Sequence, residues 1–146
     1  ENWIRIEDIL MVSDETDRYD IIIVGEGKDF DRYKKEFPKI IFKGKVERSV
    51  AMEYLHTFDI CINPWDESEI FKEKSARKTF EYLRAGKPII SSDVVGKEEF
   101  LKNDIHCLLY SPGNIKDLVN KIDTLIKPCN HFISCKKCLE EYFKNS

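Results

Sequence analysis

The longest apolar stretch of the chain is Ile21-Ile22-Ile23-Val24, and Gly25-Glu26-Gly27 follows it directly. Four consecutive apolar residues have the length of a buried strand, and the two glycines predict a tight turn out of it. Residues 28–37 are strongly charged and read as a helix. A strand, a tight turn and a helix in this order form the basic unit of an α/β fold.

The same alternation continues along the chain. Further strands are predicted over residues 39–43, 58–63, 89–91 and 107–110, and further helices over 50–58, 78–85 and 115–126. Continuously apolar strands separated by helices indicate a Rossmann-like parallel sheet with helices on both faces. Residues 1–12 are also predicted to be helical, and no strand precedes them, so we expect the first strand of such a sheet to be missing.

The composition is that of one globular domain spanning residues 1–146, with 127–146 as a C-terminal helix. The chain is 42% hydrophobic and 35% charged, with a net charge of -3, which argues against nucleic-acid binding. No apolar run approaches the roughly 20 residues that a membrane-spanning helix needs. The five cysteines are an odd set scattered through core segments, as expected for reduced thiols in a cytoplasmic protein.

In a doubly wound fold, ligands bind outside the carboxyl ends of the strands. Gly25 and Gly27 follow such an end, but the third glycine of a dinucleotide fingerprint is absent, so an ordinary turn is the alternative. Backbone groups of Val46 and Glu47, after the second strand, are placed to pair with a planar base. The alternative there is an ordinary strand-to-helix loop.

A long polar loop after Pro64 leads into a helix whose predicted start carries Ser75, Ala76 and Lys78. A helix N-terminus suits a diphosphate, and Lys78 would add a cationic donor. Glu81 lies three residues beyond Lys78, on the same helix face, where a carboxylate can accept hydrogen bonds from two ribose hydroxyls. A solvated Lys78–Glu81 pair is the alternative interpretation.

The segment from Thr79 to Ile90 resembles the signature of the C-terminal, nucleotide-sugar-binding domain of GT-B glycosyltransferases, family 4 or group 1. The segments that match further landmarks of the family, in the same order, are 23–27, 42–44, 58–64, 96–100 and 108–114. The resemblance implies that Glu81 binds the ribose and Lys78 the donor phosphates, and that the loop with Val46 and Glu47 contacts the base. It also implies that Glu73 is the catalytic glutamate near the donor sugar, a place that Glu67 or Glu69 could take instead.

The resemblance further implies a retaining transferase that uses a nucleotide-diphosphate sugar as its donor and needs no metal or other cofactor. We expect the chain to lack the family's basic, phosphate-gripping segment before the first helix and its N-terminal acceptor-binding domain. We therefore expect a partner domain or subunit, possible peripheral membrane association through it, and no transfer by this chain alone. The alternative is a non-catalytic nucleotide-sugar-binding module or one subunit of a split transferase, and an epimerase is a weaker match.

A cysteine-rich segment near the C-terminus permits a different interpretation. Cys129, His131, Cys135 and Cys138 supply four potential zinc ligands, although their spacing is not a common one. Phe132, Leu139 and Tyr142 fit the apolar face of a helix that includes the cysteines as small buried residues. We therefore predict a terminal helix and no metal.

Overall fold

Helices and strands alternate throughout the part of the chain that the computed structural model describes, which is residues 5–66, 73–94 and 102–126, with 73–76 as backbone only. The predicted helix over 127–146 and the zinc-ligand candidates lie outside it. The elements in chain order are α1 (Ile6–Glu15), β1 (Ile22–Val24), α2 (Phe30–Glu36), β2 (Ile41–Gly44), α3 (Arg48–Thr57), β3 (Cys61–Asn63), α4 (Glu73–Arg84), β4 (Ile89–Ser92), β5 (Leu108–Tyr110) and α5 (Ile115–Ile126).

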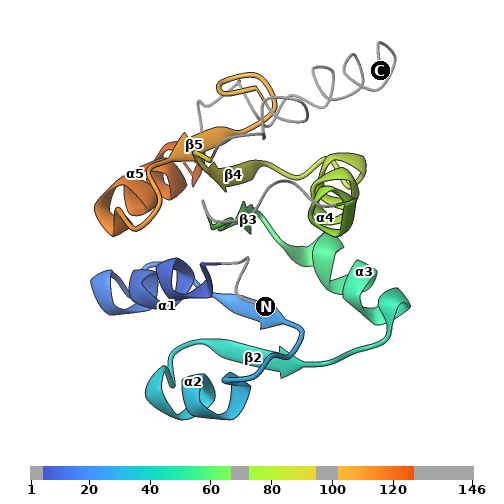
Figure 1. Cartoon of the computed structure of the whole chain (residues 1–146), viewed down its shortest axis with the longest axis vertical. Helices are drawn as coiled ribbons and strands as arrows, with labels where there is room; N and C mark the ends of the chain where they lie inside the picture. Colours follow the sequence, from blue (N-terminus) through green and yellow to red (C-terminus); the bar gives the residue numbers. More distant parts are fainter. Residues whose placement is uncertain (1–4, 67–72, 95–101, 127–146) are drawn as a thin grey trace.

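All the named strands pair in parallel, which confirms the predicted α/β class. β1 pairs with β2, and β3, β4 and β5 form a second sheet with β4 in its centre (Figure 1). Cys61, Ile62 and Asn63 lie opposite Ile89, Ile90 and Ser91 in register. The carboxyl ends of the strands in each sheet therefore lie along one edge of that sheet, which is where the candidate loops were expected.

The structure differs from one continuous sheet at a single place. Within the described residues, β1 is hydrogen-bonded only to β2, and β3 only to β4. Both sheets nevertheless pack against the same apolar cluster. The β1 side of the division contributes Ile21 and Ile23, and the β3 side contributes Ile60 and Ile62. The two sheets thus cover one core, with an unpaired strand edge on each side of the division.

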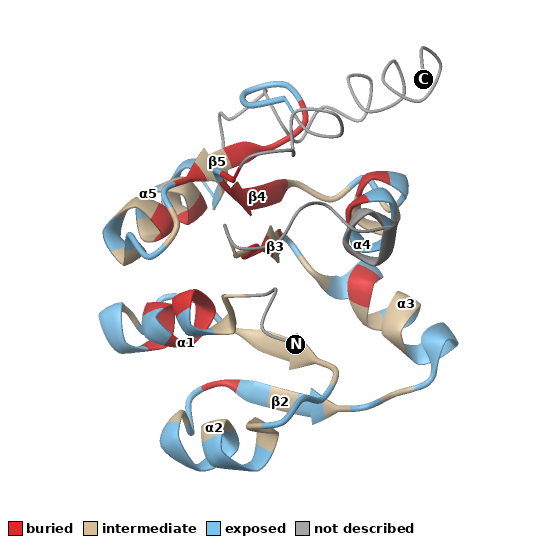
Figure 2. Cartoon of the chain, viewed as in Figure 1, coloured by how far each residue is buried: buried red, intermediate tan, exposed pale blue. Residues whose placement is uncertain are grey.

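Helices cover both faces of the sheet formed by β3, β4 and β5. Ile90 and Tyr110 pack against α1 and α5, while Ile89 and Cys107 pack in a second cluster with Leu83 of α4. Successive residues of a strand point to opposite faces, so Ile89 and Ile90 assign the two clusters to opposite sides. Figure 2 shows β4 buried along its length. This arrangement confirms the predicted helices on both faces.

Two further observations concern the cysteines and the helices of the described residues. Cys61 and Cys107 are buried free thiols, as predicted for these two cysteines. None of the described helices has the length and apolar character that crossing a bilayer would require.

Candidate functional site

The ends of β1 and β2 meet at two glycines. Gly25 has φ 128° and Gly44 has φ 70°, conformations that residues with a Cβ rarely adopt. The Gly25 N–H donates to the Gly44 carbonyl over 2.8 Å, which ties the two strand ends together. Among the described residues, no heavy atom outside the chain neighbours lies within 4 Å of a Cβ placed on Gly25 or Gly27, so the backbone here is open to close approach by a ligand.

The loop after β2 carries the two residues predicted to contact a base. Glu47 is the N-cap of α3, and its carbonyl already accepts the Ala51 N–H over 2.9 Å. Val46 is half-buried, and its backbone N–H and C=O have no hydrogen-bond partner among the described residues. Val46 therefore offers a free backbone donor and acceptor, whereas Glu47 offers its N–H alone.

Helix α4 begins earlier than the sequence predicts. Its first residue is Glu73, so the four N–H groups without a helical partner belong to residues 73–76. This places Glu73, Ser75 and Ala76 in the first turn, where an anion would bind. Lys78 is exposed in the second turn rather than at the helix start. Glu67 and Glu69, the alternatives to Glu73, lie outside the described residues.

Glu81 is half-buried, and its partner is a residue that the sequence analysis did not single out. Arg48 Nη2, from the first residue of α3, lies 3.2 Å from Glu81 Oε1, and the two side chains are 73% and 24% exposed. No ion pair joins Lys78 to Glu81 in this part of the structure, so the alternative Lys78–Glu81 pair does not form. Arg48 could have been suspected because it is the basic residue directly after the Val46–Glu47 loop.

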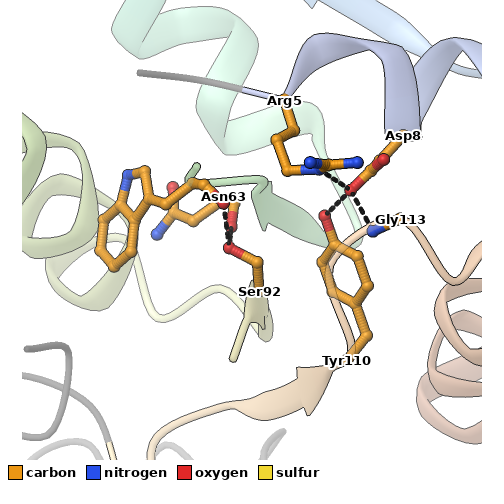
Figure 3. Close-up of polar contacts among 7 residues, drawn as sticks. Arg5, Asp8, Asn63, Ser92, Tyr110 and Gly113 are labelled. Carbon is orange, nitrogen blue, oxygen red and sulfur yellow. Dashed lines mark hydrogen bonds and ion pairs between the residues drawn. The ribbon is translucent and has the colours of Figure 1, made fainter. Parts of the chain in front are cut away.

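Buried polar contacts fix α4 against the ends of β3 and β4. Asn63 Nδ2 donates to Thr79 Oγ1 over 3.0 Å, and both residues are buried. Ser92 Oγ donates to the carbonyls of Trp65 and Asn63, at 2.9 and 3.4 Å; Figure 3 shows the contact between Ser92 and Asn63. Because Thr79 is held two residues before Glu81, the rotation of α4 about its axis is set, and with it the side on which Glu81 lies.

A second polar cluster anchors the start of α1 to the same region. The buried Asp8 carboxylate accepts hydrogen bonds from Tyr110 Oη at 2.9 Å, Gly113 N at 3.1 Å and Arg5 Nε at 3.2 Å (Figure 3). Burial of Tyr110 raises the pKa of its hydroxyl, with the Asp8 charge adding to the effect, so the hydroxyl keeps the proton that it donates.

Arg5 is a cation beside the carboxyl end of β3, and the sequence analysis did not single it out. Its backbone N–H donates to the Pro64 carbonyl just beyond β3, over 2.5 Å, and its side chain is 36% exposed. The hydrogen bond to Asp8 raises the pKa of the guanidinium, as do the charges of Asp8 and Asp66. The sequence signal was an arginine directly before a helix with an aspartate three residues later.

Metal binding has no support in the described ranges, where no group of three or more His, Cys, Asp or Glu side chains is placed to hold an ion. The groups described above are a half-buried carboxylate with its arginine partner, first-turn amides of α4 that have no helical partner, and open glycine backbone after β1. Such a set can bind a diphosphate and a diol.

Comparisons with known proteins bear on the family and the fold. A family model described as "Glycosyl transferases group 1" matches residues 5–128. No curated protein matches the chain by sequence.

Solved structures share its fold at low sequence identity. HepE from Anabaena, solved with UDP, is 16% identical with a TM-score of 0.78, over 99% of this chain and 42% of HepE. Sucrose-phosphate synthase from Thermosynechococcus elongatus is 18% identical with a TM-score of 0.79, over 99% of this chain and 38% of the synthase. TarM from S. aureus, also solved with UDP, is 19% identical with a TM-score of 0.74, over 99% of this chain and 30% of TarM. The chain thus spans less than half the length of each.

Proposed function

Because the chain belongs to the group 1 glycosyl transferases, we propose that it binds a nucleotide-diphosphate sugar and forms the donor-binding part of a retaining transferase. The observation that carries the proposal is the position of Glu81, half-buried and joined through Arg48 to the loop of Val46 and Glu47. HepE and TarM, which share the fold, were both solved with UDP, and this supports a uridine nucleotide as the first ligand to test.

Each part of the site has a role in this proposal. Glu81 accepts hydrogen bonds from the ribose hydroxyls, and the backbone of Val46 pairs with the base. The amides of residues 73–76, which have no helical partner, neutralise the diphosphate together with Lys78 on the same helix and Arg5 beside Pro64 at the end of β3, so that the site needs no metal. Glu73 lies beside the donor sugar, and the open backbone at Gly25 and Gly27 admits the ligand.

We propose further that this chain binds the donor without transferring the sugar by itself. Stabilisation of the leaving diphosphate and binding of the acceptor need groups on both sides of the ligand. The chain spans 42% of HepE, which leaves the larger share of that structure without a counterpart here. The free thiols Cys61 and Cys107 support a reducing, cytoplasmic location.

Calorimetric titration with UDP and UDP-glucose tests the proposal. Substitution Glu81→Ala removes the charged acceptor of the ribose hydroxyls, which is worth roughly 1.5–3 kcal/mol, or about 10- to 150-fold in affinity. The matched control is Glu53→Ala, an exposed glutamate of α3, which should bind UDP as the parent does. Equal affinities of Glu81→Ala and the parent would show that the ribose does not bind at Glu81.

A further inference from the structure

The contact between Arg48 and Glu81 joins two parts of the site that are far apart in sequence. Arg48 is the first residue of α3 and follows the Val46–Glu47 loop, whereas Glu81 belongs to α4. Among the described side chains, Arg48 is the one that hydrogen-bonds to the Glu81 carboxylate. A single nitrogen–oxygen contact of 3.2 Å engages Oε1 and leaves Oε2 without a described partner.

The position of Arg48 is not explained by helix stability. A cation in the first turn of a helix lies near the positive end of the helix dipole, which is unfavourable. The first turn of α3 contains no acidic residue, and the acidic N-cap residue Glu47 makes no side-chain capping hydrogen bond. An exposed ion pair also contributes little to folding. A use in ligand binding accounts for this residue better than a use in the fold.

We propose that Arg48 is a positioning residue for the nucleotide site: it holds one oxygen of the Glu81 carboxylate so that the other is presented to the ribose hydroxyls. The inference rests on the proposed function and deepens it. Arg48 restricts the rotation of a side chain that would otherwise sample several rotamers, and the ribose then meets a carboxylate already in place. The same contact links the base-contacting loop to the ribose-binding group.

The test is a double-mutant cycle read by UDP affinity in calorimetry. Because an exposed pair is worth little, Arg48→Ala should weaken UDP binding by about two- to five-fold. The double variant Arg48→Ala/Glu81→Ala should bind no more weakly than Glu81→Ala alone, since Arg48 acts through Glu81. Arg48→Lys keeps a charged donor and should recover most of the loss. Arg84→Ala, an exposed arginine at the end of α4, is the matched control.

A ligand analogue separates positioning from direct contact. With 2′,3′-dideoxy-UDP, which lacks both ribose hydroxyls, Arg48→Ala and the parent should bind equally. Weakening that persists with this analogue, or in the Glu81→Ala background, would overturn the proposal and make Arg48 a direct ligand of the nucleotide. Tighter UDP binding by Arg48→Ala would overturn it by showing that Arg48 competes with the ribose.

Failure of this inference is distinguishable from failure of the proposed function. A parent chain that binds UDP through Glu81, together with an Arg48→Ala variant of unchanged affinity, would overturn the role of Arg48 alone. A parent chain that binds neither UDP nor UDP-glucose would overturn the proposed donor site, and the positioning role with it.

Discussion

At the scale of single residues, Asp8 is a buried carboxylate with three described hydrogen-bond donors. It is 2% exposed and accepts hydrogen bonds from Tyr110, Gly113 and Arg5. Asp8→Ala would leave a buried hydroxyl and a backbone N–H without acceptors, so we expect unfolding in urea to show a loss of about 3 kcal/mol.

The control for this prediction lies on the same helix. Asp14 is exposed near the end of α1, and Asp14→Ala should change stability by no more than about 0.5 kcal/mol. If the two alanine variants were equally stable, the Asp8 cluster would have no anchoring role.

Cys61 gives the fold a specific sensitivity to alkali. Burial raises the pKa of its thiol to about 12, an effect that the charge of Lys87 opposes in part. Below about pH 9 the thiol is protonated in both states; above it, the unfolded chain loses the proton while the folded chain keeps it. Stability should therefore fall as the pH rises from 9 toward 12.

The pH effect can be isolated by substitution. Between pH 8 and 10.5, the parent should lose about 2 kcal/mol more unfolding free energy than Cys61→Ala, which has no thiol to ionise. Urea midpoints at the two pH values measure the difference. Parallel pH profiles for the parent and the variant would contradict the assignment.

At the scale of elements, α4 depends on one buried side-chain contact for its orientation. Thr79→Val removes the hydroxyl that accepts from Asn63 Nδ2 while keeping the size of the side chain. The buried amide would lose its acceptor, so we expect a loss of about 1–3 kcal/mol in unfolding free energy. UDP affinity should fall as well, because Glu81 follows on the same helix. Thr124→Val on the exposed side of α5 is the control, and equal effects of the two changes would contradict the prediction.

The periodicity of the sequence predicts which elements exist because burial imposes it. The apolar stripe that runs from Ile115 to Ile126, with Leu118 and Ile122 buried at its centre, predicts the bounds of α5. The apolar run at residues 21–24 predicts the position of β1. The start of α4 at Glu73 is missed by periodicity because residues 73–78 are mostly polar and carry no apolar period. Helix propensity is the signal that could have found it, since Glu, Lys, Ala and Arg are strong helix formers.

The candidate site was less accessible to sequence reasoning for a related reason. Glu81 stands in a recognisable segment, but its contact with Arg48 joins residues 33 positions apart in the chain and depends on how α3 and α4 are placed. Arg5 was missed because it precedes the helix stripe. The division of the sheet was also beyond prediction, because an apolar run shows that a strand is buried but not which neighbours it pairs with.

At the scale of the whole molecule, the two sheets should differ in local stability. β4 is buried throughout and paired on both sides, whereas the residues of β1 are only half-buried and those of β2 alternate between half-buried and exposed. We expect backbone amides of β1 and β2 to exchange with deuterium at least about tenfold faster than those of β4 at neutral pH. Uniform protection in all five strands would instead indicate one cooperative unit.

The unpaired edges of β1 and β3 also bear on how the protein behaves in a crowded solution. An unpaired strand presents a row of free N–H and C=O groups to which a strand of another molecule can add. The edge at Ile22–Val24 has no charged side chain among its residues, and a net charge of -3 provides little repulsion between molecules. Where the two sheets separate locally, this division exposes two strand edges at which association into β-rich aggregates can begin.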